Sequence, residues 1–266
     1  MTISLQQLVD AARERCERER SRVPSRELTA RVEHAGFVGR QPGIFRRALQ
    51  ADGMSVVAEV KGASPLAGQL KADYSPRAVG MAYEKGGAAA ISVLTEPRYF
   101  GGSLEALEDV SSAVGVPTLR KDFIVDAYQV EQAALAGASA VLLIADVLAE
   151  DPLRALTSRA HELGLDALIE VHEAAALPGA LAAESGLIGI NNRNLQTMEV
   201  DWEHSLRMAS EIPGDVVAVA ESGVRDGEQL RRLEEAGYAA ALIGTSLMTA
   251  PEPGDALARL LGEVKS

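Results

Sequence analysis

Short apolar runs rich in β-branched residues recur along the chain at a regular interval. The runs begin near Val56, Ala89, Pro117, Ala140, Asp166, Leu187, Val216 and Ala240. Successive runs lie on average about 26 residues apart, a distance that accommodates one strand, one helix and two short loops. The pattern therefore predicts eight consecutive βα units with parallel strands.

Helical periodicity fills the intervals between these runs. The predicted helices are Pro76–Lys85, Ser103–Ser112, Ala127–Ala136, Asp151–Leu163, Ala174–Ala183, Trp202–Glu211, Gly227–Ala236 and Gly254–Val264. Several are followed by a glycine, such as Gly164 or Gly237, which suits the left-handed conformation that commonly ends a helix. Eight such units close naturally into a (β/α)8 TIM barrel, an α/β fold. An open doubly wound sheet is the alternative, but no Gly-rich dinucleotide fingerprint follows the first run.

The residues before the first strand have a different pattern. Ser4–Ser21 carries apolar side chains at helical spacing and is expected to form an amphipathic helix. Val23–Gly43 is polar and interrupted, and Pro42 is expected to begin a short second helix. We treat residues 1–266 as a single barrel domain on which residues 1–52 pack as an extra N-terminal helical extension.

The composition narrows the class of protein. Hydrophobic residues make up 47% of the 266 residues, enough for a large core. The net charge of −12 disfavours nucleic acid and anionic membranes as partners, although lysines in a cleft can still attract a small anionic substrate. There is neither a secretory apolar segment nor a run of about 18 apolar residues that could span a membrane. The single cysteine, Cys16, cannot form an internal disulfide, and we expect a cytoplasmic protein.

Polar residues gather where the predicted strands end, which is where barrels of this kind have their active sites. The residues at these positions are Glu59, Lys61, Lys121, Glu170, Asn191, Asn192, Arg193, Glu221, Ser222, Gly244, Thr245 and Ser246. Because side chains alternate along a strand, Glu59 and Lys61 fall on one face while Val60 points the other way. The sequence thus predicts a mixed cluster of lysines and carboxylates at one mouth.

Each of these residues also has a structural interpretation. A single Lys or Glu at a strand end is often a solvated rim residue, and Arg120–Asp122 is compatible with an ordinary exposed ion-pair run. The functional interpretation is favoured, because the eight predicted strands fix the strand-end positions independently of residue type, and charged residues occupy most of these positions. The histidines show no metal-site spacing and are interpreted as structural or exposed: His34, His161, His172 and His204. No metal or organic cofactor is expected.

The last two predicted strands carry a second signal. Glu221–Val224 and Ile243–Ser246 both place glycine and hydroxyl residues at a strand-to-loop turn. Free backbone N–H groups at such a turn, and at a following helix N-terminus, form an anion site, and phosphate binding at this place recurs in barrels. Ser64 and Lys61 would approach from the first strand, which neighbours the eighth in a closed barrel.

Seven segments combine these features in a recognisable order. They are Ala58–Pro65, Val93–Ser103, Leu119–Ile124, Leu168–Val171, Ile188–Leu195, Ala220–Val224 and Leu242–Met248. In sequence and order they resemble the indole-3-glycerol phosphate synthase family, whose extra N-terminal helices also match. The resemblance implies conversion of 1-(2-carboxyphenylamino)-1-deoxyribulose 5-phosphate to indole-3-glycerol phosphate, CO2 and water, in tryptophan biosynthesis.

The resemblance also implies roles for the strand-end residues. Lys121 would be the general acid that protonates the substrate carbonyl, and Glu170 the general base in ring closure and loss of water. Lys61 would pair with the substrate carboxylate or phosphate. Glu59 and Asn191 would orient the lysines and the substrate hydroxyls.

Further residues complete the implied site. Ser222 is counted with the catalytic residues, in the polar wall beside Arg193 and Glu221. The implied substrate-binding residues are Ser64, Phe123, Leu142, Arg193, Glu221, Gly223, Gly244 and Thr245. The two apolar ones would contact the anthranilate ring, and the glycines and Thr245 would hold the phosphate. The expected partner is a small anionic phosphorylated substrate, and the expected state is a monomer, with a weak homodimer as the alternative.

One loop departs from the family. Gly62–Gly68 has small or apolar residues where the family usually has a basic residue and a Ser-Pro-Ser-Lys-Gly segment, which bears on loop closure and substrate affinity. A phosphoribosylanthranilate isomerase-like barrel is one rival, but Cys16 lies far upstream of the first strand for its cysteine–aspartate chemistry. The other rival is a catalytically silent phosphate-binding barrel, against which the intact lysines and glutamates argue.

Overall fold

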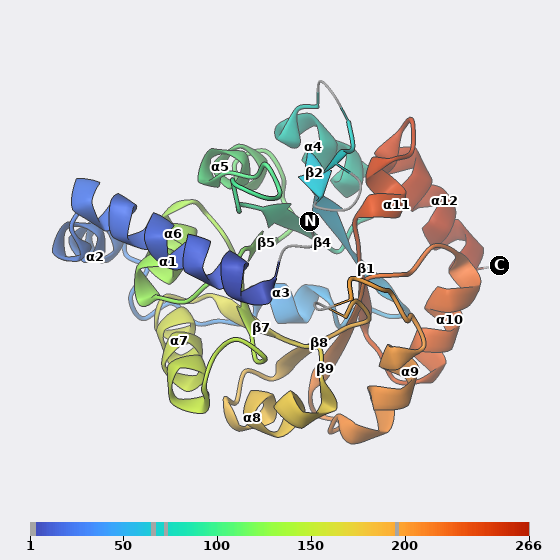
Figure 1. The fold of residues 1–266 in the computed structure, drawn as a ribbon. Helices are drawn as coiled ribbons and strands as arrows, with labels where there is room; N and C mark the ends of the chain where they lie inside the picture. Colours follow the sequence, from blue (N-terminus) through green and yellow to red (C-terminus); the bar gives the residue numbers. More distant parts are fainter. Residues whose placement is uncertain (1–3, 65–67, 72–73, 195–196, 266) are drawn as a thin grey trace.

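The computed structural model describes residues 4–64, 68–71, 74–194 and 197–265. Its centre is a closed barrel in which the parallel strands follow the order β1-β10-β9-β8-β7-β6-β5-β4 (Figure 1). The strands are β1 (Ser55–Val60), β4 (Ala90–Leu94), β5 (Thr118–Lys121), β6 (Ala140–Ile144), β7 (Asp166–Val171), β8 (Leu187–Asn191), β9 (Val217–Glu221) and β10 (Ala240–Ile243). Each begins within one residue of its predicted start. Pairing of β1 with both β10 and β4 confirms the (β/α)8 barrel and excludes the open sheet.

Helices surround this barrel (Figure 1). They are α4 (Pro76–Lys85), α5 (Leu104–Ser111), α6 (Ala127–Leu135), α7 (Glu150–Glu162), α8 (Leu177–Ala182), α9 (His204–Met208), α10 (Gly227–Glu235) and α12 (Pro253–Lys265). Two predicted helices are interrupted by 3-10 turns, η1 (Ala174–Ala176) before α8 and η2 (Ala209–Glu211) after α9. Pro178 explains the first break, because it lacks an N–H and fits only the first turn of a new helix.

Three short elements were not predicted. A two-stranded antiparallel pair, β2 (Ala63–Ser64) and β3 (Gly68–Gln69), follows β1. The four-residue helix α11 (Thr245–Met248) follows β10 directly. All three are too short to show a periodic pattern in the sequence, and all three lie beside the carboxyl ends of the strands.

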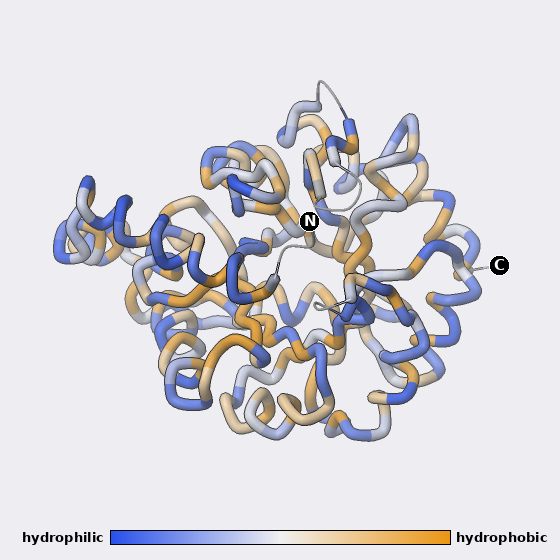
Figure 2. The backbone as a smooth tube through the Cα atoms, viewed as in Figure 1, coloured by the Kyte–Doolittle hydropathy of each residue, from blue (hydrophilic) through white to orange (hydrophobic). Residues whose placement is uncertain are grey.

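Side chains alternate between the barrel interior and the helical layer along each strand. Interior side chains include Val57, Leu119, Leu142, Leu168 and Val219. The intervening positions pack under the helices and include Val56, Val141, Ile169 and Ile190. Figure 2 shows hydrophobic residues along the strands and hydrophilic ones on the outer helices. The two-residue period places Glu59 and Lys61 on the same interior face as Val57.

Residues 4–52 of the N-terminal extension contain three helices, α1 (Leu5–Arg22), α2 (Ser25–His34) and α3 (Ile44–Ala48). The interpretation of Val23–Gly43 as broken was wrong, because α2 occupies Ser25–His34. Its only buried side chains are Leu28 and Val32, so its apolar stripe is too short to stand out in the sequence. The same helix contacts α6, and that tertiary contact supplies the stability that its own pattern lacks.

The short helix α3 closes the amino-terminal end of the barrel. Phe45 and Leu49 are fully buried and belong to the interior apolar cluster of the strands. The backbone N–H groups of Phe45 and Arg46 donate to Asp166 Oδ2 at 2.9 and 3.0 Å. An acidic group at the start of a helix satisfies N–H groups that have no partner within it. In this structure α3 therefore contributes both apolar side chains and N–H groups to one end of the barrel.

The residues on either side of Lys121 are not exposed. Arg120 and Asp122 are only 1% and 2% exposed, so the surface ion-pair interpretation of this run is wrong. Asp122 Oδ1 lies 2.7 Å from Nη2 of Arg15 in α1, and Asp122 Oδ2 lies 3.0 Å from Arg120 Nη2. Thr95 Oγ1 also donates to this carboxylate at 2.6 Å. A buried charge needs such partners, and here they tie α1 to the end of β5.

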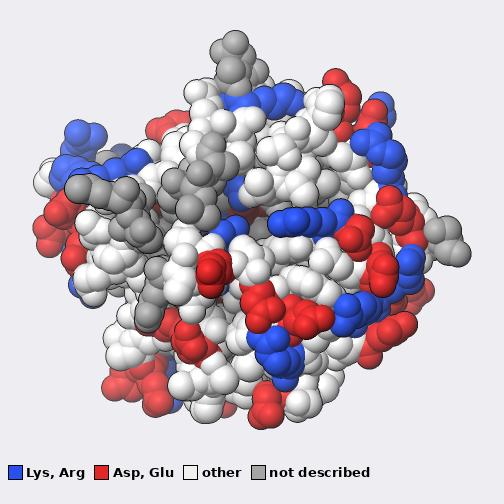
Figure 3. All heavy atoms as spheres, turned by 45° about the vertical axis from the view of Figure 1, so that its right-hand side comes forward, with Lys and Arg blue, Asp and Glu red and all other residues white. Residues whose placement is uncertain are grey.

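The molecular surface carries both signs of charge. On the face in Figure 3, Lys and Arg side chains lie among Asp and Glu rather than in one continuous basic surface. In the part of the chain that the structure describes, no helix has the length and apolar character needed to cross a membrane.

Candidate active site

A cavity of about 760 Å³ opens among the carboxyl ends of the strands. All the predicted site residues except Ser64 line it: Glu59, Lys61, Lys121, Phe123, Leu142, Glu170, Asn191, Arg193, Glu221, Ser222, Gly223, Gly244 and Thr245. The side chain of Ser64 and residues 65–67 of the altered loop lie outside the described part of the structure. The topology thus brings together side chains that are far apart in the sequence.

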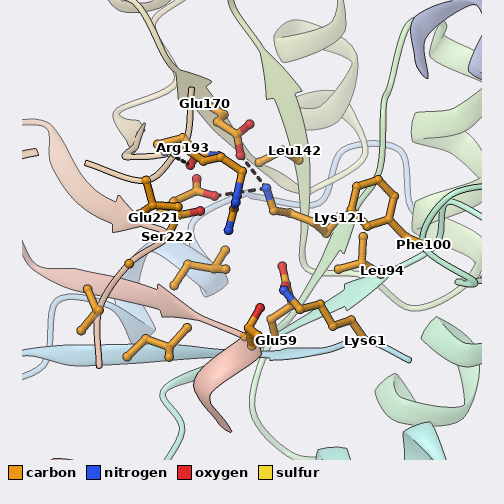
Figure 4. A pocket seen from close by; sticks show the side chains of 18 of the residues that line it. Glu59, Lys61, Leu94, Phe100, Lys121, Leu142, Glu170, Arg193, Glu221 and Ser222 are labelled. Carbon is orange, nitrogen blue, oxygen red and sulfur yellow. Dashed lines mark hydrogen bonds and ion pairs between the residues drawn. The ribbon is translucent and has the colours of Figure 1, made fainter. Parts of the chain in front are cut away.

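Lys121 occupies the centre of the polar wall. Its Nζ lies 2.5 Å from Glu170 Oε2 and 3.1 Å from Glu221 Oε2. Figure 4 shows this ammonium group between the two carboxyl groups, which come from β7 and β9. Both carboxyl groups are buried, so each depends on a nearby cation for its stability as an anion.

The surroundings push the pKa values of the two glutamates apart. Burial opposes ionisation of Glu170, but Lys121 and His172 outweigh it and hold its pKa well below the ordinary value. Burial raises the pKa of Glu221 to about 8, since the attraction of Lys121 is too weak to offset burial and the adjacent Glu170. Burial alone would lower the pKa of Lys121, but Glu170 and Glu221 raise it above its ordinary value. At neutral pH the centre therefore holds one ionised and one protonated carboxyl group, the arrangement that acid–base catalysis uses.

The second lysine lies across the cavity, directly after the last residue of β1. Lys61 Nζ lies 2.8 Å from Glu59 Oε1, and the pair faces the start of α11. A Cβ at Gly244 would collide with the Glu59 carboxylate and lie 2.9 Å from Lys61 Nζ. Gly189 on β8 stands in the same relation to the Glu221 carboxylate, and it was not predicted. Both glycines leave room for a carboxylate that reaches in from a neighbouring strand.

The loop after β8 holds Arg193 over the cavity. Asn191 Oδ1 accepts a hydrogen bond from the Arg193 backbone N–H at 3.0 Å, and Arg193 Nη1 donates to the carbonyl of Met198 at 3.0 Å. Asn192 does not line the cavity, and its Nδ2 donates to the carbonyl of Ser222 at 2.9 Å. Asn191 and Arg193 thus line the cavity, while Asn192 joins the loops after β8 and β9.

The turns after β9 and β10 carry the predicted glycine and hydroxyl residues but differ in backbone shape, since Gly244 after β10 has a φ of −123°. Ser222 and Gly223 have φ values of 66° and 92°, in the left-handed region. Thr245 begins α11, and the first N–H groups of a helix have no partner within it. Together these turns supply hydroxyl and backbone N–H groups beside the cavity, a suitable lining for an anion.

A family model described as indole-3-glycerol phosphate synthase matches residues 5–260. The chain belongs to the indole-3-glycerol phosphate synthase family. The member from Rhodopirellula baltica is 45% identical over 95% of this chain and 96% of its own length. The member from Lactiplantibacillus plantarum is 42% identical over 98% of this chain and 99% of its own length.

Solved structures of other proteins share the fold. Thiamine phosphate pyrophosphorylase from Pyrococcus furiosus superposes with a TM-score of 0.60 at 16% identity, covering 83% of this chain and 98% of that chain. A structure of KGPDC from Streptococcus mutans gives a TM-score of 0.65 at 12% identity, covering 80% of this chain and 97% of that chain. At these identities the likeness concerns the barrel alone.

The apolar side of the cavity includes residues beyond the predicted ring contacts Phe123 and Leu142 and the nearby Phe100. Phe123 and Leu142 line the cavity together with Phe100, whose ring centroid lies 6.3 Å from that of Phe123. Leu8 of α1 and Leu94 of β4 line it too. No local signal marks Leu8, because its place depends on how α1 crosses the mouth of the barrel (Figure 1).

Two residues outside the predicted site are informative: His172 contacts Glu170, and Cys16 bears on the isomerase-like alternative. His172, interpreted as structural or exposed, is buried with Nε2 at 2.7 Å from Glu170 Oε1. Its position two residues after Glu170, which continues the alternation of β7 by one residue, was the available signal. Cys16 packs with Leu28 and Tyr128 under α1 and does not line the cavity, which disfavours the isomerase-like alternative. Among the described residues, no group of three or more His, Cys, Asp or Glu side chains could hold a metal ion.

Proposed function

We propose that this chain converts 1-(2-carboxyphenylamino)-1-deoxyribulose 5-phosphate into indole-3-glycerol phosphate, as its family does in tryptophan biosynthesis. In this reaction the ring carbon that bears the carboxylate attacks the substrate carbonyl. Loss of CO2 restores the aromatic ring, and loss of water completes the indole. The observation that carries the proposal is that Lys121 Nζ lies 2.5 Å from Glu170 Oε2 and 3.1 Å from Glu221 Oε2, in a cavity with an apolar side.

Lys121 acts as the general acid in this scheme. The carbonyl oxygen becomes an alkoxide as the ring carbon attacks, and an alkoxide is a stronger base than an amine. Even a lysine whose pKa is raised by Glu170 and Glu221 therefore gives up its proton to it. The fixed ammonium group also stabilises the developing negative charge before the transfer is complete.

Glu170 acts as the general base. The neighbouring cations hold its pKa low, so it is an anion that can take the proton released during ring closure and loss of water. Glu221 carries a proton at neutral pH and is placed to hydrogen-bond the hydroxyl that leaves. Both carboxyl groups reach the same ammonium, which supports their action on one reacting centre.

Lys61 binds the carboxylate of the substrate, with Glu59 fixing its position. The 2.8 Å pair between them supports this role, since a lysine held by one carboxylate keeps two hydrogens for a ligand. Asn191 and Arg193 orient the sugar hydroxyls. Phe123 and Leu142 contact the anthranilate ring.

The phosphate binds at the turns after β9 and β10. Gly223, Gly244 and Thr245 provide backbone N–H groups, and Ser222 provides a hydroxyl. Ser64 is proposed to close this site from the first βα loop. The altered loop Gly62–Gly68 is proposed to weaken substrate affinity rather than the proton chemistry.

The test is an assay for indole fluorescence with the purified chain and the synthetic carboxyphenylamino substrate. We expect product from the wild-type chain and a rate about 10²–10⁴-fold lower from Lys121→Met. Lys85→Met, on the exposed last turn of α4, is the matched control and should behave like wild type. Absence of product from a folded wild-type chain would reject the synthase function and leave the silent barrel.

We further propose that the chain works as a cytoplasmic monomer in which the N-terminal extension and the barrel fold as one unit. The burial of Arg15 against Asp122 supports the last point. Sedimentation velocity at working concentration should give the mass of a single chain. A concentration-dependent dimer would contradict the monomer.

A further inference from the structure

His172 follows the last residue of β7 and is held at both its backbone and its ring. Its backbone N–H donates to Asp146 Oδ2 at 2.8 Å, and that of Glu173 donates to Asp146 Oδ1 at 3.1 Å. This carboxylate, from the loop after β6, fixes the turn from which the imidazole projects. The ring is buried beside Glu170.

The imidazole lies between two hydrogen-bond acceptors. Nδ1 lies 2.9 Å from the backbone carbonyl oxygen of Arg193, and Nε2 lies 2.7 Å from Glu170 Oε1. A carbonyl oxygen only accepts, so Nδ1 must carry a hydrogen. A neutral imidazole would then present a bare Nε2 to the carboxylate, unless Glu170 itself carried a proton.

The surrounding charges decide between these two states. Glu170 faces Lys121 with its other oxygen, Oε2, at 2.5 Å, so cations on both sides favour the carboxylate. Asp146 adds a second negative charge near His172, while the Arg193 loop contributes a carbonyl. Burial lowers the pKa of His172, but Glu170 and the Arg193 carbonyl outweigh it and raise the pKa. Glu221, across Lys121, is the member of the centre that holds the extra proton.

We propose that His172 is a positioning residue that, as an imidazolium clamped by the Arg193 carbonyl, keeps Glu170 ionised and its Oε2 directed at Lys121. This inference rests on the proposed role of Glu170 as general base. The same clamp links Glu170 to the loop after β8, whose Arg193 side chain lines the cavity. His172 thereby fixes the position of Glu170 relative to the loop that carries Arg193.

The first test compares the pH profiles of kcat/KM for wild type and His172→Gln. Glutamine can still donate an N–H to Glu170 but carries no charge. An opposite charge at this range lowers a carboxyl pKa by about 1–3 units, so the acidic limb should move up by about that amount. His161→Gln, on α7 and outside the cavity, is the matched control and should leave the profile in place. An unmoved limb with a uniformly lower profile would mean that His172 is merely structural.

The second test reads the wild-type ring directly and needs no variant to fold. In ¹⁵N-labelled protein, the His172 imidazole should show both nitrogens protonated at pH 7 and should titrate above the ordinary value of about 6.5. A neutral ring at pH 7 in an active enzyme would overturn the positioning role and leave the synthase function standing. An inactive wild-type chain would instead overturn the proposed function.

Discussion

The two active-site lysines are equally exposed but have different neighbours. Each side chain is 14% exposed, yet Lys61 contacts one carboxylate, Glu59, whereas Lys121 contacts two, Glu170 and Glu221. In the Lys61 pair one ammonium group faces one carboxylate. The Lys121 centre combines an ionised Glu170 with a Glu221 whose pKa is raised to about 8, so it can both accept and donate a proton. The neighbouring carboxyl groups, rather than residue type or depth, distinguish the two lysines, and on this basis we propose Lys61 for binding and Lys121 for proton transfer.

The two centres also differ in how the chain assembles them. Glu59 and Lys61 lie two residues apart at the end of one strand. Lys121, Glu170 and Glu221 come from β5, β7 and β9, which meet only because the barrel closes. The pair of Glu59 and Lys61 needs only one strand end, while the Lys121 centre needs the closed barrel to bring three ionisable groups together.

The largest expected effect is the loss of turnover in Lys121→Met. Methionine preserves most of the side-chain volume but removes the acid, so kcat should fall about 10²–10⁴-fold while KM changes little. Steady-state kinetics with indole fluorescence measure both parameters, and circular dichroism checks the fold. A kcat within tenfold of wild type would contradict the assignment of Lys121.

Lys61→Met should chiefly weaken binding. A charge-assisted hydrogen bond contributes roughly 1.5–3 kcal/mol, so KM should rise about 10- to 100-fold if Lys61 holds the substrate carboxylate. The same assay, carried to high substrate concentration, separates KM from kcat. A large fall in kcat at unchanged KM would assign proton transfer to Lys61 and contradict its role in binding.

Ionisation of Glu221 should lower kcat on the alkaline side of the pH profile, which gives the profile an alkaline limb. Because its pKa is raised to about 8, it is protonated below that pH and ionises above it, which adds a second negative charge beside Glu170. At pH 9 about one molecule in ten retains the proton, so kcat should lie about tenfold below its plateau. Glu221→Gln imitates the protonated form and should lose this limb. A limb unchanged in the variant would exclude Glu221 as its source.

Asp122→Asn should affect stability more than turnover. The change leaves Arg15 and Arg120 without their shared buried carboxylate, and breaking such a contact costs about 3–5 kcal/mol. Urea unfolding measures this loss, and Asp109→Asn on the exposed face of α5 is the matched control. The folded variant should retain kcat within about tenfold, because the Asp122 carboxylate, although it lines the cavity, contacts Arg15, Arg120 and Thr95 rather than the Lys121 centre. A loss of turnover as large as that of Lys121→Met would show that the Asp122 carboxylate is needed for catalysis as well as for stability.

The sequence predicted those features that repeat or depend on neighbours along the chain. Each strand start follows from a short apolar run, and Glu59 and Lys61 share a face because side chains alternate. The strand-end rule brought Glu170 and Glu221 to the same mouth without knowledge of their contacts.

Features that depend on tertiary contacts were not predictable. The helix α2 is stabilised by packing on α6, and Leu8 reaches the cavity only because α1 crosses the mouth. The burial of Arg120 and Asp122 depends on Arg15, more than a hundred residues away. His172 had the right spacing, but the Arg193 carbonyl that fixes its ring comes from the loop after β8.

Single-turnover kinetics at saturating substrate test the central division of labour most directly, because binding no longer limits the rate. Under these conditions Lys61→Met should recover to within about tenfold of wild type, while Lys121→Met should stay about 10²-fold or more below it. Equal rates in the two variants, or a slower Lys61→Met, would contradict the assignment of proton transfer to the Lys121 centre.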